Sequence, residues 1–318
     1  MKCFLGFDGG GTKTDCVVLN ETGAIVTRGK GPASNPTRIG FPAAFAALKE
    51  AANSAINSTR TPLEVAALCA GLAGTGREEN REKMKQFLSA QFPNALVDVR
   101  MDLELPLFAM PEGAAIVLVA GTGSAAIGRD AAGAIRREGG LGPGTSDEGS
   151  AFEIGQMAIA VSRTATLPAT TLPPAIPSVD YQELSREILQ HLGLSNWGEV
   201  DAISVVEPDA IYPRIFPIVA ASADAGNTCA QSVLNSAAKK LAAIVYRVAE
   251  SLNVLQMPFP LGKIGGTVGR SRYFDRVLDE ELRSKLPFAT ITKLSIEPAE
   301  VAAWIALQLF KQRTGNTP

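Results

Sequence analysis

Near its start the chain places a carboxylate, three glycines and a hydroxyl next to one another. Asp8 ends an apolar, strand-like stretch and is followed by glycines at positions 9–11 and then by Thr12. Glycines let backbone N–H groups approach a polyanion, because no Cβ stands in the way. A carboxylate just before such a turn suits a Mg²⁺ ion that keeps much of its water shell. The pattern therefore indicates binding of nucleotide phosphates with Mg²⁺.

This first turn differs from the two most familiar nucleotide motifs. Neither GxxxxGK[ST] nor GxGxxG occurs in it, and it lies in a predicted hairpin rather than at the start of a helix. A plain tight hairpin turn is the alternative interpretation. Ordinary hairpins need one or two glycines, whereas this turn has three between Asp8 and a Thr-Lys-Thr sequence.

Two further glycine turns follow strand-like segments later in the chain. Residues 121–124 (Gly-Thr-Gly-Ser) come after the apolar stretch 114–120 and offer N–H donors and two hydroxyls. In the third turn, the predicted strand 263–268 ends in the glycine pair Gly265-Gly266 and runs into a helix. A glycine turn of this kind can lie flat under a nucleobase or ribose. Each turn alone could be an ordinary connection.

A strand–glycine turn–strand–strand–helix pattern occurs twice, which predicts a structural repeat. Two such units would face each other across a cleft, where ligands are often bound. We expect domains at 1–113 and 114–318, separated by the break Pro111-Glu112-Gly113. The sequence leaves open whether a final helix at 297–312 packs back on the first lobe, and it predicts a loop over the Pro-rich stretch 167–178.

Composition narrows the class of protein. The chain has 318 residues, is 46% hydrophobic and carries a net charge of −2, which is typical of a soluble globular protein and not of a nucleic-acid-binding one. No apolar run reaches the length of a membrane span, and the N-terminus enters a strand without a signal-peptide pattern. We therefore expect a cytoplasmic protein with no membrane or nucleic-acid partner.

The cysteines and the single histidine give little support to nucleophilic catalysis. Cys3, Cys16, Cys69 and Cys229 form no CxxC pair, which favours free buried thiols. His191 lies in a polar stretch and is expected at the surface. A Ser-His-Asp or Cys-His mechanism would depend on this one residue.

The three turns resemble known nucleotide-binding motifs. DGGGTKTD (8–15), GTGS (121–124) and IGGTVG (264–269) are similar to the two phosphate loops and the adenosine motif of the actin, sugar kinase and heat-shock ATPase superfamily. The N-acetylglucosamine kinase group is the closer match, and it shares its domain family with the activator ATPases of 2-hydroxyacyl-CoA dehydratases and benzoyl-CoA reductase. Supporting matches lie at 33–36, 71–74, 101–102, 139–142 and 146–151.

The resemblance implies a fold and an activity. The fold is α/β, with two ribonuclease H-like (actin-like ATPase) lobes, each a mixed sheet with flanking helices, and an active-site cleft between them. The activity is ATP- and Mg²⁺-dependent phosphorylation of an amino sugar at its C6 hydroxyl, with N-acetylglucosamine as the first candidate. Such kinases are often dimeric, so a homodimer is compatible with the resemblance.

The resemblance also assigns roles to single residues. Asp8 would face Mg²⁺ through water, and Asp102 would be the base that meets the C6 hydroxyl. The matching ATP-binding positions are Gly10, Gly11, Thr12, Lys13, Gly121, Thr122, Gly123, Gly265 and Gly266. The matching sugar-binding positions are Asn35, Asp102, Ser124, Gly140, Leu141, Gly142 and Asp147.

The local sequence agrees with the two acidic assignments and also allows each acid a purely structural role. Asp102 follows the predicted strand 96–101, so its carboxylate can orient a hydroxyl and accept its proton, or it can cap the short helix expected at 103–110. Asp147 and Glu148 follow a glycine-rich stretch and can accept hydroxyl hydrogen bonds together, or they can favour the N-terminus of the next helix.

Two departures from the sugar kinase pattern leave the sugar open. Leu141 stands where an aromatic residue is common, and Ala125 stands where Asn is common. Glucosamine or another hexose is therefore an alternative substrate. An activator ATPase with a cysteine-bound iron–sulfur cluster, or a sugar or nucleotide sensor without turnover, are alternatives from other classes.

Overall fold

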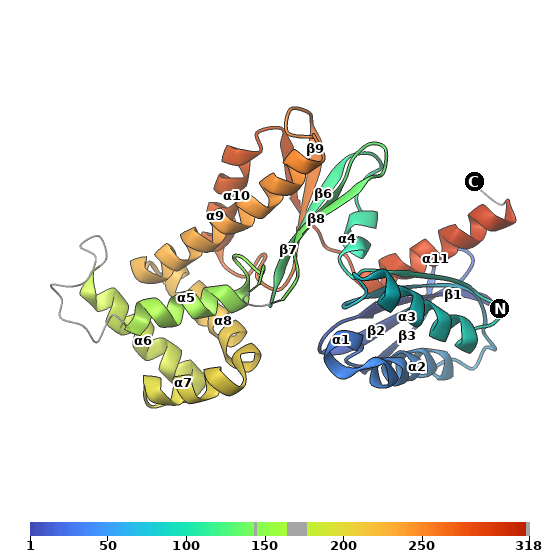
Figure 1. Ribbon diagram of the computed structural model, residues 1–318, viewed down its shortest axis with the longest axis horizontal. Coiled ribbons are helices and arrows are strands. Elements are labelled where there is room, and N and C mark those ends of the chain that lie inside the picture. The colour runs from blue at the N-terminus through green and yellow to red at the C-terminus, as the bar shows by residue number, and fades with distance from the viewer. Residues whose placement is uncertain (143–144, 164–176, 316–318) are drawn as a thin grey trace. The chain divides into compact units, whose positions relative to one another are not determined.

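The computed structural model describes residues 1–142, 145–163 and 177–315 (Figure 1). The chain divides into two compact units. Unit 1 comprises Met1–Met110 and Ser295–Pro318, and unit 2 comprises Pro111–Leu294. Each unit contains one five-stranded mixed sheet with helices packed against it. The expected α/β fold with two mixed sheets is confirmed.

The sheet of unit 1 has the strand order β3-β2-β1-β4-β5. An antiparallel meander is formed by β1 (Lys2–Gly9), β2 (Lys13–Leu19) and β3 (Ile25–Pro32). Two parallel strands, β4 (Glu64–Leu72) and β5 (Leu96–Arg100), extend it beyond β1. The carboxyl ends of β1, β4 and β5 therefore meet at one edge of the sheet.

Helices cover both faces of this sheet. The buried side chains of α2 (Phe41–Asn57) and α3 (Glu78–Gln91) form one core with it. On the other face, α4 (Glu104–Phe108) and α11 (Pro298–Thr314) form a second core. A four-residue helix, α1 (Pro36–Ile39), follows β3.

The last helix belongs to unit 1, beside the first strands of the chain (Figure 1). Its buried face is made of alanines and one leucine, which lets the helix approach the sheet closely. A Cβ on Gly6 of β1 would lie 2.1 Å from both Ala299 O and Ala303 N. Small residues on both sides therefore set the contact between α11 and the sheet.

The sheet of unit 2 repeats the topology of the first. Its order is β8-β7-β6-β9-β10, read from the meander outwards. The meander is β6 (Ala115–Ala120), β7 (Ser124–Arg129) and β8 (Ile135–Gly139), and the parallel strands are β9 (Phe259–Ile264) and β10 (Ala289–Lys293). The structural repeat inferred from the sequence is thus present in the sheets.

Unit 2 adds a larger set of helices around one continuous core. The long helix α9 supplies many of its buried side chains, among them Leu234, Leu241 and Val245. The helices are α5 (Ala151–Arg163), α6 (Ser178–Leu192), α7 (Trp197–Val206), α8 (Pro208–Ala225), α9 (Thr228–Ser251) and α10 (Arg272–Lys285).

Some elements differ from the sequence prediction. The strand β9 covers Phe259–Ile264, so the expected strand 263–268 was wrong in position. Prolines at 258 and 260 disfavour a strand here in the sequence, because proline donates no backbone hydrogen bond. The elements α1, α7 and β10 were not predicted. The predicted loop 167–178 lies, up to residue 176, outside the described residues.

The cysteines and the histidine lie where the sequence predicts them. All four cysteines are buried and free, as expected. His191 is exposed, and its Nε2 lies 3.0 Å from Arg214 O.

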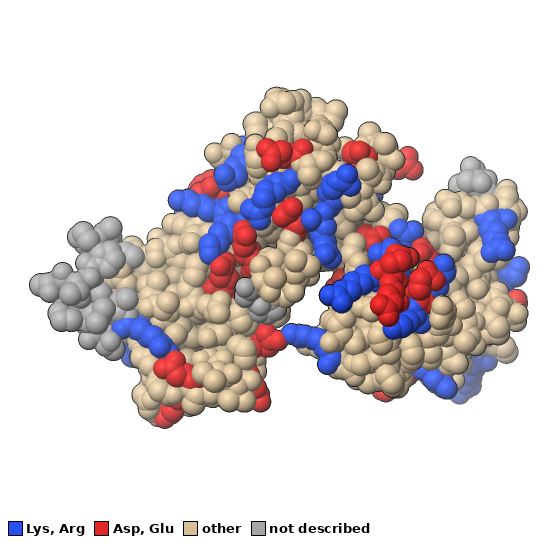
Figure 2. Space-filling model, viewed as in Figure 1, with Lys and Arg blue, Asp and Glu red and all other residues tan. Residues whose placement is uncertain are grey.

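Figure 2 shows Lys and Arg interspersed with Asp and Glu over the visible face. Among the described helices, none combines the length and the apolar character that crossing a membrane requires.

Candidate active site

In unit 1 the sheet brings two predicted site carboxylates together. Asp8 lies near the end of β1, and Asp102 lies just beyond β5. The pKa of Asp8 is raised to about 6, chiefly by burial and then by the charges of Asp102 and Asp15, against the opposing charge of Lys13. Desolvation and nearby like charges both disfavour an ionised carboxylate. The ionised Asp8 is therefore a group that a bound cation would stabilise.

Two glycines of the first turn, Gly9 and Gly10, have different surroundings. A Cβ on Gly9 would lie 2.2 Å from Ser34 Oγ and 2.5 Å from a methyl carbon of Leu72, so Gly9 is needed for packing. A Cβ on Gly10 would meet only Lys13 O, at 3.8 Å. Gly10, unlike Gly9, thus presents backbone to which a ligand has access.

Two cations lie beside this turn. Lys13 Nζ is 2.5 Å from Asp15 Oδ2, and this hydrogen bond raises the pKa of Lys13. Arg38 of α1 lies against Gly11, because a Cβ there would be 3.1 Å from Arg38 Nη1. Arg38 was not predicted as a site residue. The sequence feature that could have indicated Arg38 is its position about one helical turn after Asn35, which caps α1.

Asp8 also borders a cavity of about 410 Å³ in unit 1. Charges of both signs line it, including Lys13, Asp15, Arg28 and Glu297. Arg28 forms an ion pair with Glu297, so the start of α11 is tied to β3 beside this cavity. The Asp8 carboxylate thus has polar space beside it that can hold ions and water.

Asn35 lies against Gly74, at the same edge of the sheet. A Cβ on Gly74 would be 2.3 Å from Asn35 Oδ1. Asn35 caps α1, because its Oδ1 accepts hydrogen bonds from Thr37 N (3.0 Å) and Thr37 Oγ1 (2.7 Å). The carbonyl oxygen is therefore engaged, which leaves the amide NH₂ of Asn35 as the group with which it can bind a ligand.

Asp102 lies in a short connection that polar contacts hold in place. Leu103 N donates to Asp102 Oδ1 at 3.0 Å, a local contact at the start of α4. Glu104 is buried and accepts from Met101 N at 3.3 Å, and one of its oxygens lies 3.7 Å from Arg100 Nη1. The capping role considered for Asp102 is not observed, because Leu103 is the N-cap of α4 and no side chain among the described residues caps this helix. Asp102 is near enough to Asp8 to raise the pKa of that carboxyl.

In unit 2 the second and third glycine turns lie side by side. They follow the adjacent parallel strands β6 and β9. Ala120 O accepts hydrogen bonds from Thr267 N (3.1 Å) and Thr267 Oγ1 (2.9 Å). A Cβ on Gly121 would lie 3.4 Å from Gly266 N. The two turns, which lie far apart in the sequence, thus form one backbone surface.

The two glycines of the third turn have different tasks. Gly265 has φ +125°, and a Cβ on it would lie 2.1 Å from Ala120 O. Only glycine fits this close approach. A Cβ on Gly266 would meet nothing within 4 Å, so its face is open. Gly266 is the glycine of this pair that can lie under a flat ligand group.

Asp147 is placed against the second glycine turn. It is 9% exposed, and a Cβ on Gly123 would lie 2.6 Å from Asp147 Oδ2. Burial raises the pKa of Asp147, and the N–H groups of Gly142, Ser124 and Gly140 partly offset this rise. Its Oδ1 is buried and has no hydrogen-bond partner among the described residues. A buried acceptor of this kind is costly unless a ligand supplies a donor.

The neighbouring site positions have other contacts. Ser124 Oγ donates to Glu148 O at 2.6 Å, so the Ser124 proton is already engaged. Gly140 N donates to Ser124 O at 2.9 Å. Leu141 is 64% exposed, whereas Ala125 is buried. Of the two departures noted in the sequence, Leu141 is therefore the one whose side chain has access to a ligand within unit 2.

The residues fit a nucleotide with Mg²⁺. Gly10 and Gly266 leave open backbone surface, which phosphate and ribose groups can approach. The pKa of Asp8 is raised chiefly by burial, so a divalent cation bound near it would stabilise its charged form. Asp8 would hold Mg²⁺ through water, and the ion would neutralise charge on the phosphates.

The repeated sheet, with glycine turns at strand ends, is the fold of the actin-like sugar kinases. A solved structure of a Chromobacterium violaceum protein assigned as an N-acetylglucosamine kinase matches with a TM-score of 0.73 and 22% identity, over 96% of this chain and 99% of that one. A ROK family glucokinase from Streptomyces griseus, in complex with glucose and AMPPNP, matches with a TM-score of 0.58 and 18% identity, over 96% and 99%. At these identities the matches establish the fold.

The chain belongs to the BadF/BadG/BcrA/BcrD ATPase family, whose model matches residues 5–306. ATP is accordingly its nucleotide. An N-acetyl-D-glucosamine kinase from Dictyostelium discoideum is 25% identical, over 98% of this chain and 99% of its own. An N-acetylmuramic acid/N-acetylglucosamine kinase from Clostridium acetobutylicum is also 25% identical, over 96% and 98%.

Proposed function

We propose that the protein is a sugar kinase that transfers the terminal phosphoryl group of ATP to the C6 hydroxyl of an amino sugar. N-acetylglucosamine is the first candidate substrate, because both curated relatives act on it by name. N-acetylmuramic acid is a second candidate substrate, because the name of the Clostridium acetobutylicum relative includes it. Glucosamine and other hexoses remain alternatives, since an exposed Leu141 cannot stack on a sugar as an aromatic side chain does.

The neighbouring carboxylates Asp8 and Asp102 carry this proposal. Phosphoryl transfer to a hydroxyl needs charge neutralisation at the phosphates and a base at the acceptor. Asp102 is near enough to Asp8 to raise its pKa, beside a turn with open backbone. In our assignment Asp8 faces Mg²⁺ through water, and Asp102 accepts the hydroxyl proton as the new O–P bond forms.

The remaining residues bind and orient the two substrates. The glycine turns at 10–12 and 121–123 hold the phosphates, and Arg38 and Lys13 add positive charge to the first turn. Gly265 and Gly266 support the adenosine. Asn35 donates to sugar hydroxyls through its amide, while Asp147 accepts from them through Oδ1, which has no partner among the described residues. A hydroxyl donor there would remove the cost of the buried acceptor.

The other two classes of function are less well supported. An activator ATPase would need thiolates able to reach a shared iron–sulfur cluster, yet each of the four cysteines is at most 1% exposed. A sensor without turnover does not need a base beside Asp8. A cytoplasmic location remains our proposal from the sequence pattern, and a homodimer remains our proposal from the family resemblance. Light scattering of the purified chain tests the homodimer.

Measurement of ADP release across a panel of sugars tests the proposal. With ATP and Mg²⁺ we expect turnover with at least one of N-acetylglucosamine, N-acetylmuramic acid, glucosamine and glucose. Replacing Asp102→Asn should lower kcat by about 10²–10⁴-fold, because the base is lost while the side chain keeps its size. Glu82→Gln, at an exposed position of α3, is the matched control and should keep normal turnover.

Two results would overturn the assignment. Near-normal turnover of Asp102→Asn with the preferred sugar would exclude Asp102 as the base. Thermal stabilisation by a sugar, with no ADP release from any member of the panel, would favour the sensor instead.

A further inference from the structure

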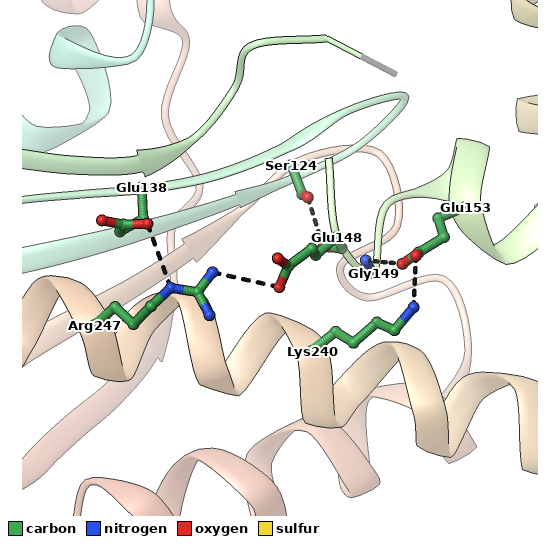
Figure 3. A network of polar contacts seen from close by, with 7 residues as sticks. All are labelled: Ser124, Glu138, Glu148, Gly149, Glu153, Lys240 and Arg247. Atoms are coloured by element: carbon green, nitrogen blue, oxygen red, sulfur yellow. Dashed lines mark hydrogen bonds and ion pairs between the residues drawn. The ribbon is translucent and has the colours of Figure 1, made fainter. Parts of the chain in front are cut away.

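Two cations on one side of α9 reach towards the segment that carries Asp147 (Figure 3). Lys240 and Arg247 are seven residues apart, which is about two helical turns, so both project from the same face of the helix. Neither residue stands in a motif, and no role was predicted for them. Their partners are three glutamates that lie around the segment 139–149.

Arg247 joins the two ends of this segment. Its Nε lies 3.3 Å from an oxygen of Glu138, near the end of strand β8, and its Nη2 lies 3.3 Å from an oxygen of Glu148. Ser124 also joins the two ends of the segment. Its backbone oxygen accepts a hydrogen bond from Gly140 N, and its Oγ donates to Glu148 O. The segment is therefore fixed at both ends by one guanidinium and one serine.

Lys240 fixes the next residues along the chain. Its Nζ lies 2.5 Å from Glu153 Oε1, and Glu153 Oε2 accepts from Gly149 N at 2.6 Å. Gly149 is itself wedged against α9, since a Cβ on it would lie 2.6 Å from Ala237 O. The start of α5 and the end of the segment thus share one attachment to α9.

This arrangement gives the adjacent acids Asp147 and Glu148 different roles. Glu148 turns to Arg247 on α9, whereas Asp147 packs against Gly123 with its Oδ1 unpartnered among the described residues. The two residues share one peptide unit, which is planar and rigid. The contacts of Glu148 with Arg247 and Ser124 therefore restrain the backbone from which the Asp147 side chain projects.

We propose that Arg247 is a positioning residue for sugar binding: by bridging Glu138 and Glu148 it keeps Asp147 turned towards Gly123. This inference rests on the proposed function for the identity of the ligand. The side chains of Arg247, Glu138 and Glu148 are 41–42% exposed, so salt screens the two ion pairs. Arg247 acts through Asp147 and has no direct part in the chemistry.

Kinetics of Arg247→Ala test the proposal. We expect the KM for the sugar to rise about 3–10-fold, with kcat and the KM for ATP changed by less than about 2-fold, because sugar orientation is affected and the phosphate turns are not. The sugar KM of Arg247→Lys should lie between those of the wild type and of Arg247→Ala, because one ammonium cannot bridge both acids as a forked guanidinium does. Added NaCl should raise the sugar KM of the wild type and leave that of Arg247→Ala unchanged.

Hydrogen exchange tests the same contact without any substrate. Amides of residues 139–142 and 145–149 should exchange about 3–10-fold faster in Arg247→Ala than in the wild type, while those of β6 should not change. Arg186→Ala is the matched control, because Arg186 forms an exposed ion pair with Glu183 on α6. That variant should leave both the exchange and the sugar KM unchanged.

The outcomes separate this inference from the proposed function. Unchanged exchange at these amides in Arg247→Ala would overturn the positioning role, whatever the substrate. Faster exchange together with equal losses in both KM values and in thermal stability would show a general structural role and would also overturn it. If the wild type turns over no sugar, the proposed function fails, and exchange alone still decides whether Arg247 holds the segment.

Discussion

At the scale of residues, Asp8 is where stability and function are in conflict. Its pKa is raised from 3.8 to about 6, chiefly by burial and then by Asp102 and Asp15. Between these two values the folded chain holds a proton that the unfolded chain has released. Stability therefore falls as the pH rises from 3.8 to about 6, and the ionised Asp8 destabilises the fold at neutral pH. A protein keeps such a group where its charge is used.

Replacing Asp8→Asn should therefore stabilise the ligand-free protein and abolish its turnover. We expect the free energy of unfolding at about pH 7.5 to rise by about 3 kcal/mol, because a neutral amide avoids the cost of the buried charge. At about pH 3.5 the gain should largely vanish, since Asp8 is then mostly protonated in both states. Urea denaturation at the two pH values measures this. An equal gain at both would mean that charge is not the cause.

At the scale of elements, the contact between β1 and α11 depends on small residues. Gly6 faces the backbone of Ala299 and Ala303, and the helix presents further alanines on the same face. Gly6→Ala should force α11 away from the sheet and lower the stability of unit 1 by about 1–3 kcal/mol or more. Thermal unfolding of the variant measures the loss.

The exposed face of the same helix supplies the control for this prediction. Gln308→Ala should leave the melting temperature unchanged, because Gln308 is exposed. A normal melting temperature for Gly6→Ala would mean that α11 adjusts without cost. That result would remove the packing explanation for the glycine at position 6.

At the scale of the whole molecule, unit 1 is built from both ends of the chain. Residues 1–110 supply its sheet, and Ser295–Pro318 supplies α11, which buries one face of that sheet. A chain that ends at residue 294 should lose the cooperative unfolding of unit 1 and keep that of unit 2, since unit 2 lies within Pro111–Leu294. Calorimetry with limited proteolysis measures both.

A chain that ends at residue 315 is the matched control, because it retains α11 through Thr314. It should unfold like the full chain. Resistance of residues 1–110 to protease in the chain that ends at 294 would contradict the prediction. Unit 1 would then be stable without its last helix.

Local chemistry made part of this protein predictable. The sequence pattern indicated the three glycine turns and the duplicated meander, because turns and strands depend on neighbouring residues. It failed at β9, where two prolines argue against a strand that the pairing with β6 nevertheless forms. It also missed α7 and β10, short elements whose formation depends on packing within unit 2.

The sequence by itself determined the repeated strand and turn pattern and which residue types could bind phosphate. Only the tertiary structure decided which glycines are open and which are needed for packing, as Gly266 and Gly265 illustrate. It also turned Glu148 towards Arg247 and left Asp147 Oδ1 unpartnered among the described residues. The physical reason is that strand order and helix packing bring distant segments together, and no local pattern encodes those contacts.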